Sequence, residues 1–139
     1  MKRSSLIAFL FVITTTCSGI PVLAGNNDPL FVNMTTDQEH RSTMALGFSK
    51  AQSERGHPVT IFLNDKGVLV ASKNNAVQFK EQQAILLTII KKGGVVIACP
   101  SCMKKYGVTS SDLLDGIKVG TPELTGEALF QDNTKTLSW

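Results

Sequence analysis

The stretch that decides the fold is Val95-Val96-Ile97-Ala98-Cys99-Pro100-Ser101-Cys102, in which an unbroken apolar run ends at two cysteines. An apolar run without polar alternation predicts a central strand that helices cover on both faces. Proline is favoured in the first turn of a helix, so Pro100 predicts a helix that begins directly after the strand. The sequence therefore predicts a strand that leads two thiols into a helix start.

Cys99 and Cys102 are the candidate catalytic residues. The thiolate is the reactive form of cysteine, and the free N–H groups of a helix N-terminus and nearby cations such as Lys104 favour it. In a Cys-x-x-Cys pair the first thiol is generally the nucleophile, and the second can resolve a mixed disulfide. The simpler interpretation is that both are small apolar residues of the core. The spacing at the end of a strand favours reactivity.

Strands and helices alternate on either side of this stretch. The patterns predict strands at residues 30–34, 58–63, 95–98, 117–119 and 134–137, and helices at residues 36–55, 79–92, 100–106 and 122–129. Residues 68–78 are less regular, and we expect a surface loop or a short helical turn there. Such alternation predicts one α/β domain with a mainly parallel five-stranded sheet and helices on both faces.

The first of these helices carries two sequence signals. Thr36 and Glu39 have the spacing of a capping box, which predicts that the helix begins there. Met44, Phe48 and Ala51 recur at helical spacing, which predicts that they form the apolar stripe facing the core.

Further candidate residues follow from the predicted topology, because sites in open α/β sheets lie outside the carboxyl ends of the strands. On that rim we place His40, Asp65 and Lys104 as candidate contributors beside the cysteines. The simpler interpretations are a solvated side chain for His40 and a turn residue for Asp65. His57 enters its strand from the opposite end, and we expect it to lie away from the thiols.

The first residues predict an exported protein. Lys2 and Arg3, an apolar run at residues 6–13, and Val22-Leu23-Ala24 are typical of a signal peptide at residues 1–24. The domain then spans residues 25–139, and Cys17 is lost with the signal. We expect a periplasmic location and no stable membrane span after cleavage, because the apolar stretch is short beside the roughly 20 residues of a spanning helix.

Charge and ligand chemistry exclude several function classes. The net charge is +3 and the charged residues are dispersed, which argues against nucleic acid as a partner. Zinc would need four ligands, and the predicted rim offers two thiols and at most His40. We therefore predict no metal and no cofactor in the leading interpretation. Copper(I) stays an alternative, because two thiolates are suitable soft ligands.

The sequence resembles the DsrE/DsrF-like proteins. The resemblance is strongest in residues 96–103, followed by Gly107 and the Asp-Leu…Gly-Ile stretch at residues 112–117. It implies a small α/β fold, frequent homo-oligomers and sulfur relay, in which a cysteine accepts a sulfane sulfur as a persulfide and passes it on. Cys99 matches the cysteine position of the family, whereas Cys102 falls where many members have a small residue such as serine.

These observations together predict an exported sulfur-handling protein. Cys99 is the persulfide acceptor and Cys102 the resolving or second thiol; if the protein is an enzyme, it is a sulfurtransferase-like carrier. Its partners would be sulfur donor and acceptor proteins or a thiol reductant. One alternative is a thiol–disulfide redox module that uses the same pair, which an oxidising compartment favours. The other is a non-catalytic binding protein, with copper(I) as its candidate ligand.

Overall fold

The computed structural model describes residues 27–139, so the predicted signal peptide at residues 1–24 lies outside the described residues. The strands are β1 (Leu30–Met34), β2 (Val59–Leu63), β3 (Val95–Ala98), β4 (Lys118–Val119) and β5 (Lys135–Ser138). The α-helices are α1 (Glu39–Glu54), α2 (Gly67–Val70), α3 (Lys80–Lys91), α4 (Pro100–Tyr106) and α5 (Pro122–Leu129). No helix in this part of the chain combines the length and the apolar character needed to cross a membrane.

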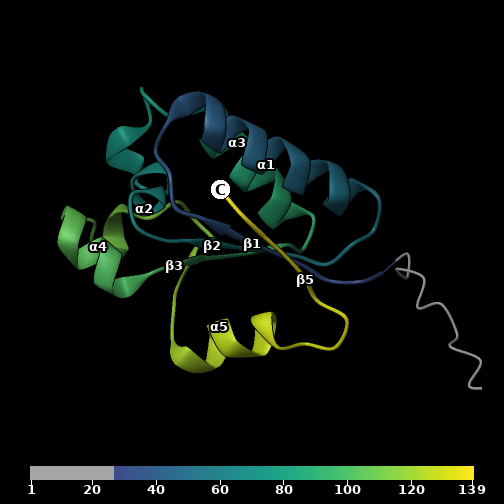
Figure 1. Ribbon diagram of the computed structural model, residues 1–139. Coiled ribbons are helices and arrows are strands. Elements are labelled where there is room, and N and C mark those ends of the chain that lie inside the picture. The colour runs from purple at the N-terminus through teal and green to yellow at the C-terminus, as the bar shows by residue number, and fades with distance from the viewer. Residues whose placement is uncertain (1–26) are drawn as a thin grey trace, which may run out of the picture.

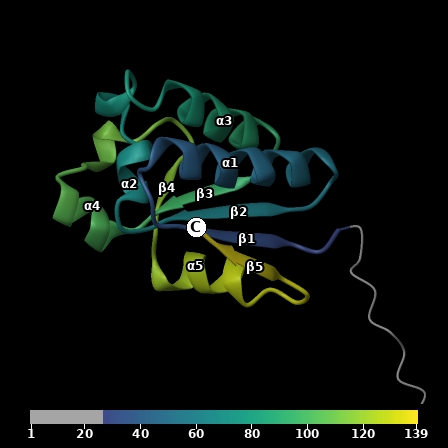
Figure 2. The ribbon, with the colours of Figure 1, turned by 45° about the horizontal axis from the view of Figure 1, so that its top comes forward.

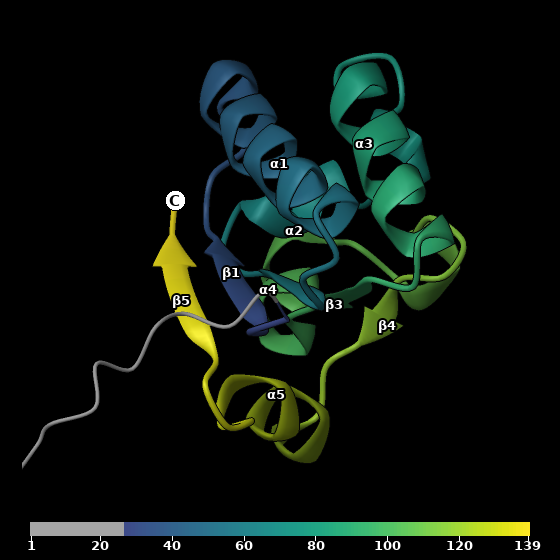
Figure 3. The same cartoon turned by 90° about the vertical axis from the view of Figure 1, so that its right-hand side faces the viewer.

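The strands form one sheet in the order β4-β3-β2-β1-β5, and every pair of described neighbours is parallel (Figures 1 and 2). Helices α1 and α3 cover one face of this sheet, and α5 lies on the other (Figures 2 and 3). The predicted fold class is therefore confirmed.

The core explains why the apolar runs become strands. Val32, Met34 and Ile61 are fully buried and belong to one core cluster with Leu46 of α1 and Leu86 of α3. In β3, both Val96 and its neighbour Ile97 are buried, although consecutive side chains of a strand point to opposite faces. Burial on both faces is what the unbroken apolar run predicted.

Helix α1 begins later than the capping box predicted. Its first residue is Glu39, and the Thr36 hydroxyl instead accepts a hydrogen bond from the Gln38 N–H, at 3.0 Å. The preceding residue is tied to the end of β5, because both the N–H and the hydroxyl of Thr35 donate to the Trp139 carbonyl. These bonds hold the chain beside β5 for a few residues after β1, so the helix starts after them.

The buried face of α1 also differs from the predicted stripe. Met44 and Phe48 are 53% and 41% exposed, and the residues facing the core are Ser42, Ala45, Leu46 and Ser49. The two serines can be buried because their hydroxyls donate to backbone carbonyls one turn earlier in the helix. Ala51 is exposed as well, so none of the three residues of the predicted stripe is buried, and two serines share the core-facing positions with Ala45 and Leu46.

The irregular segment after β2 is buried over its first half. Residues 67–70 form the short helix α2, in which Val68 and Val70 are fully buried, and Ala71 after it is buried as well. The Gln83 side chain of α3 donates to the carbonyls of Val70 and Ser72 and so satisfies this buried backbone. Of the two expectations, a short helical turn is confirmed and a surface loop is wrong for these residues.

Candidate functional site

The two cysteines lie together at the carboxyl end of β3. The Cys99 N–H donates to the Leu63 carbonyl at 2.9 Å, which extends the pairing of β2 and β3 by one residue and fixes the Cys99 backbone at the edge of the sheet. Cys102 lies in the first turn of α4, and its sulfur is 3.0 Å from the Cys99 sulfur. Both thiols are free and half-buried. The structure therefore places a close pair of thiols at the predicted rim.

The turn between β2 and α2 holds the sulfur of Cys102. The Cys102 thiol donates to Asn64 Oδ1 at 3.0 Å, and the Asp65 backbone N–H donates to the same sulfur at 3.2 Å. Burial raises the pKa of the Cys102 thiol, and the hydrogen bond to Cys99 raises it further, whereas the Asp65 N–H acts in the opposite direction. Burial and the contact with Cys99 thus both favour the protonated form of Cys102.

A second set of contacts joins the same turn to α4. The Tyr106 hydroxyl donates to Asp65 Oδ1 at 2.5 Å, and the Lys105 ammonium lies 3.8 Å from this oxygen and 5.1 Å from the centre of the Tyr106 ring. The tyrosine hydrogen bond is the main reason that the pKa of Asp65 lies below its ordinary value, and Lys105 adds to the effect. Asp65 is therefore a turn residue, as the simpler interpretation predicted, and it also connects this turn to α4, the helix that carries Cys102.

This link leads to a first prediction, on the variant Tyr106→Phe. Without the hydroxyl, the Asp65 carboxylate loses its strongest hydrogen bond, and we expect the pKa of Asp65 to rise toward its ordinary value. A titration of the Asp65 carboxyl carbon by NMR measures this pKa directly. The carboxyl of Asp112, which is held by Thr109 elsewhere in the chain, serves as the internal control and should not change. An Asp65 titration identical to that of the wild type would contradict the contact.

The other predicted rim residues lie differently. His40 and Lys104 are exposed, and none of the hydrogen bonds or ion pairs found among residues 27–139 joins either of them to a cysteine. Their contribution to the site stays a prediction. Asn64, which the topology also places on this rim after β2, takes part in the network together with Lys105 and Tyr106. A signal for the last two exists in the sequence, because they lie three and four residues after Cys102 and so share its face of a helix.

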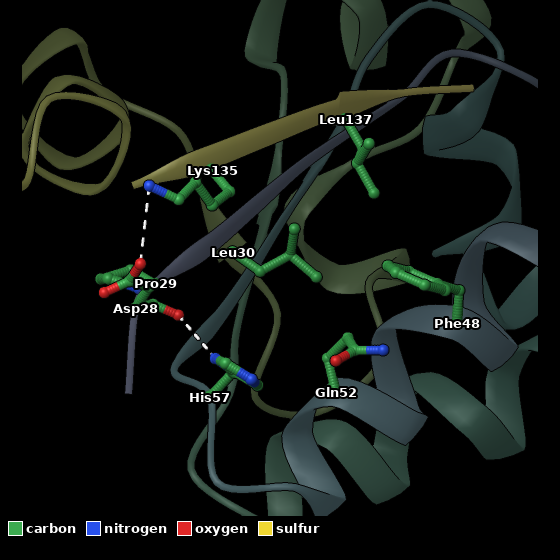
Figure 4. A pocket seen from close by; sticks show the side chains of 8 residues that line it. All are labelled: Asp28, Pro29, Leu30, Phe48, Gln52, His57, Lys135 and Leu137. Atoms are coloured by element: carbon green, nitrogen blue, oxygen red, sulfur yellow. Dashed lines mark hydrogen bonds and ion pairs between the residues drawn. The ribbon is translucent and has the colours of Figure 1, made fainter. Parts of the chain in front are cut away.

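His57 lies at the opposite end of the sheet, as the topology predicted. Its Nδ1 is 2.9 Å from the Asp28 carbonyl, and it lines a cavity of about 220 Å³ with Leu30, Phe48 and Lys135 (Figure 4). Leu30 and Lys135 are the first residues of β1 and β5, so this cavity lies at the amino ends of parallel strands. It is separate from the thiol pair.

A further hollow lies on the face of the sheet that α5 partly covers. This pocket, of about 330 Å³, is lined by Phe31, Phe62 and Asn64 among others, and its lining carries no charged side chain. Asn64 thus lies between the pocket and Cys102. In the described part of the chain, no three His, Cys, Asp or Glu side chains come together as a metal site.

The fold and the site together define a class: a small, all-parallel α/β protein with a thiol pair at the carboxyl end of an internal strand. The model of the DsrE/DsrF-like family matches residues 30–133. The chain therefore belongs to the DsrE/DsrF-like family, and in general terms it is a protein of the sulfur-relay type.

The chain is also similar to two curated relatives, and solved structures share its fold. The chain is 34% identical over 84 residues to "Uncharacterized protein MJ0989" of Methanocaldococcus jannaschii, an alignment that covers 60% of this chain and 74% of the relative. It is 30% identical to "Uncharacterized protein MK0008" of Methanopyrus kandleri, over 60% and 69% of the two chains. The ychN protein from E. coli has the same fold, with a TM-score of 0.66 at 17% identity, over 81% of this chain and 99% of its own. MTH1491 from Methanobacterium thermoautotrophicum matches with a TM-score of 0.66 at 14% identity, over 81% and 100%.

Proposed function

We propose that the protein accepts a sulfane sulfur on Cys99 as a persulfide and that Cys102 is the resolving or second thiol. The observation that supports this proposal is the 3.0 Å separation of the two sulfurs in a member of the DsrE/DsrF-like family. Cys99 lies at the edge of the sheet where sites of α/β proteins are found. Cys102 is close enough to react with any sulfur that Cys99 carries.

Each step of this chemistry balances. The Cys99 thiolate attacks the outer sulfur of a donor persulfide, the S–S bond of the donor breaks, and the donor leaves as a thiolate. An acceptor thiolate then takes the same sulfur from Cys99 by the reverse exchange. Alternatively, the Cys102 thiolate attacks the Cys99 sulfur itself, which forms a Cys99–Cys102 disulfide and releases hydrogen sulfide. The second route needs a thiol reductant to restore the pair.

The proposal includes a cell compartment and partners. A signal peptide at residues 1–24 would place the protein in the periplasm, where it would meet a sulfur donor, a sulfur acceptor or a thiol reductant. Secretion of the full chain from a bacterial host, followed by N-terminal sequencing of the periplasmic product, tests this part. A mature N-terminus at Gly25 supports it, and an uncleaved protein in the cytoplasm contradicts it. The homo-oligomer that the family resemblance implies stays a prediction.

The decisive experiment adds sulfur to the reduced protein. The protein is incubated with a polysulfide, and peptide mass spectrometry then locates any added mass of sulfur. Extra sulfur on Cys99 supports the proposal. Two unmodified thiols, at a donor concentration that modifies a free cysteine peptide, contradict it.

A thiol–disulfide redox module is the second candidate, and the same 3.0 Å separation supports it. In this case the pair gives two electrons and two protons to an oxidised disulfide of a partner and becomes a Cys99–Cys102 disulfide. A fast and reversible Cys99–Cys102 disulfide that exchanges with a model protein disulfide, with no sulfur donor present, would favour this candidate. A disulfide that forms only after polysulfide treatment, with release of hydrogen sulfide, is instead the resolving step of sulfur relay.

The variant Cys102→Ser separates the two candidates. In sulfur relay, we expect the Cys99 persulfide to last roughly tenfold longer or more, because the thiol that would expel its sulfur as hydrogen sulfide is gone. In the redox module, the same variant accumulates mixed disulfides between Cys99 and the partner. Time-resolved intact-mass measurement distinguishes an added sulfur from an added partner. A persulfide lifetime equal to that of the wild type would show that Cys102 does not resolve it.

A further inference from the structure

The Cys102 thiol has one proton and two acceptors for it. Its sulfur lies 3.0 Å from Asn64 Oδ1 and 3.0 Å from the sulfur of Cys99, and it is placed to donate to either. A single S–H bond can point fully at only one acceptor at a time. The position of this proton therefore depends on the chemical state of Cys99.

We propose that Asn64 is a positioning residue that receives the Cys102 proton whenever Cys99 carries a sulfur, and so keeps Cys102 from expelling it. The inference rests on the proposed function, and it adds a regulator of the persulfide lifetime to the same site. It assigns this role to a residue of the β2–α2 turn that lies 38 positions before Cys102 in the chain.

The two states of Cys99 differ in how well its sulfur accepts a hydrogen bond. A Cys99 thiolate is a charged acceptor, and the Cys102 S–H donates to it. Once Cys99 carries a persulfide, its inner sulfur is a neutral divalent atom and a weak acceptor. The amide oxygen of Asn64 is then the better acceptor at the same distance, so the proton turns toward it.

Proton placement controls the resolving step, because the thiolate and not the thiol is the nucleophile. Attack of Cys102 on the persulfide forms the Cys99–Cys102 disulfide and releases hydrogen sulfide, and it requires that Cys102 first lose its proton. An amide oxygen holds a proton by a hydrogen bond but is not a base that removes it. Asn64 therefore slows the release of sulfide and leaves time for transfer to an acceptor.

The oxygen of Asn64 is fixed before any sulfur arrives. It also accepts the Asp65 backbone N–H at 2.8 Å, and the Asn64 backbone N–H donates to the Met34 carbonyl at 2.9 Å. These two hydrogen bonds hold Asn64 in place in the turn. Its Oδ1 therefore marks one position toward which the Cys102 S–H bond has to point in order to donate to it.

The charged and titratable neighbours of Cys102 do not replace this role. They are Cys99 before α4, Asp65 in the turn, and Lys105 and Tyr106 within α4. The carboxylate of Asp65 accepts a hydrogen bond from Tyr106 and forms an ion pair with Lys105. The Asp65 backbone N–H donates to the Cys102 sulfur and so favours the thiolate rather than the thiol. Asn64 is the neighbour whose side chain accepts the Cys102 proton through oxygen.

The test uses a Cys99→Ser background, and mass spectrometry follows alkylation on the peptide that contains Cys102, separately from Cys17. The pH at which iodoacetamide reacts at half its maximal rate reports the protonation of Cys102. For Asn64→Ala we expect this midpoint at a pH lower by roughly 0.5 to 1, because the acceptor that stabilises the thiol is lost. For Asn64→Asp we expect a higher midpoint, because the carboxylate keeps the acceptor and repels the thiolate. The exposed Asn27 provides the control variant Asn27→Ala, which should not change the midpoint.

Opposite shifts in the two Asn64 variants support the proposal. A loosened turn alone would move both midpoints in the same direction, so shifts in the same direction, or unchanged midpoints, overturn the proposal.

With Cys99 intact, Asn64→Ala is expected to shorten the persulfide lifetime several-fold and to speed sulfide release by the same factor. An unchanged lifetime also overturns the proposal. If wild-type Cys99 takes up no sulfur, the proposed function fails, and the alkylation midpoints still decide whether Asn64 holds the Cys102 proton.

Discussion

Replacement of Cys99 by serine is expected to reduce sulfur uptake to background, a loss of roughly 100-fold or more. A serine hydroxyl is not ionised near neutral pH, and its oxygen cannot carry a sulfane sulfur as a persulfide. The remaining thiol cannot take over efficiently, because Cys102 is held by Asn64 and its pKa is raised by burial. Peptide mass spectrometry after polysulfide treatment measures the uptake at each cysteine.

The matched control for this prediction is Cys102→Ser, in which the neighbouring thiol is removed and Cys99 remains. We expect this variant to take up sulfur on Cys99 at the same initial rate as the wild type and to retain it for longer, because the resolving thiol is gone. Circular dichroism of both serine variants should show the same folded domain, since both residues are half-buried and serine is of similar size. Undiminished sulfur uptake by Cys99→Ser would mean that Cys102 is the persulfide acceptor and that Cys99 is the second thiol.

The sequence predicted the fold well where burial alone decides the local structure. The apolar run at residues 95–98 became a buried internal strand, and the proline signals at Pro100 and Pro122 marked the first residues of α4 and α5. Periodicity failed in α1, because it assumes that large apolar residues face the core. The buried serines of α1 satisfy their hydroxyls within the helix, and a pattern of side-chain polarity does not contain this information.

The candidate site was predictable to the extent that it follows from topology. Parallel strands bring their carboxyl ends to one edge, so Asp65 and the thiol pair were expected near one another, and the structure places them there. Which of the two lysines, Lys104 or Lys105, reaches Asp65 depends on the rotation of α4 about its axis. The composition of a seven-residue helix does not predict this rotation. The contact of Asn64 with Cys102 depends on the exact path of the backbone through the turn between β2 and α2, and the sequence pattern does not predict this path.

The backbone path of the turn between β2 and α2 depends on Gly67. We expect the variant Gly67→Ala to destabilise the protein by about 3 kcal/mol. A Cβ atom at this position would lie 2.3 Å from the Met34 carbonyl oxygen and 3.1 Å from its carbon. Neither atom belongs to a flexible side chain, so the backbone itself has to move. The same carbonyl accepts the Asn64 N–H, and the Gly67 N–H donates to the Asn64 carbonyl. A shift of Gly67 therefore also displaces the turn that holds Cys102.

Urea denaturation measures the loss, and Gly47→Ala is the matched control. Gly47 lies inside α1 with nothing within 4 Å of an added Cβ, so its replacement should stabilise the protein by roughly 0.5 to 1 kcal/mol. The same glycine-to-alanine substitution is thus expected to change the free energy of unfolding in opposite directions at the two positions. A general effect of the added methyl group would change it in one direction only. In Gly67→Ala the alkylation midpoint of Cys102 should also differ from that of the wild type. Wild-type stability together with an unchanged midpoint would mean that the turn does not depend on this close approach, and that Asn64 is held by other contacts.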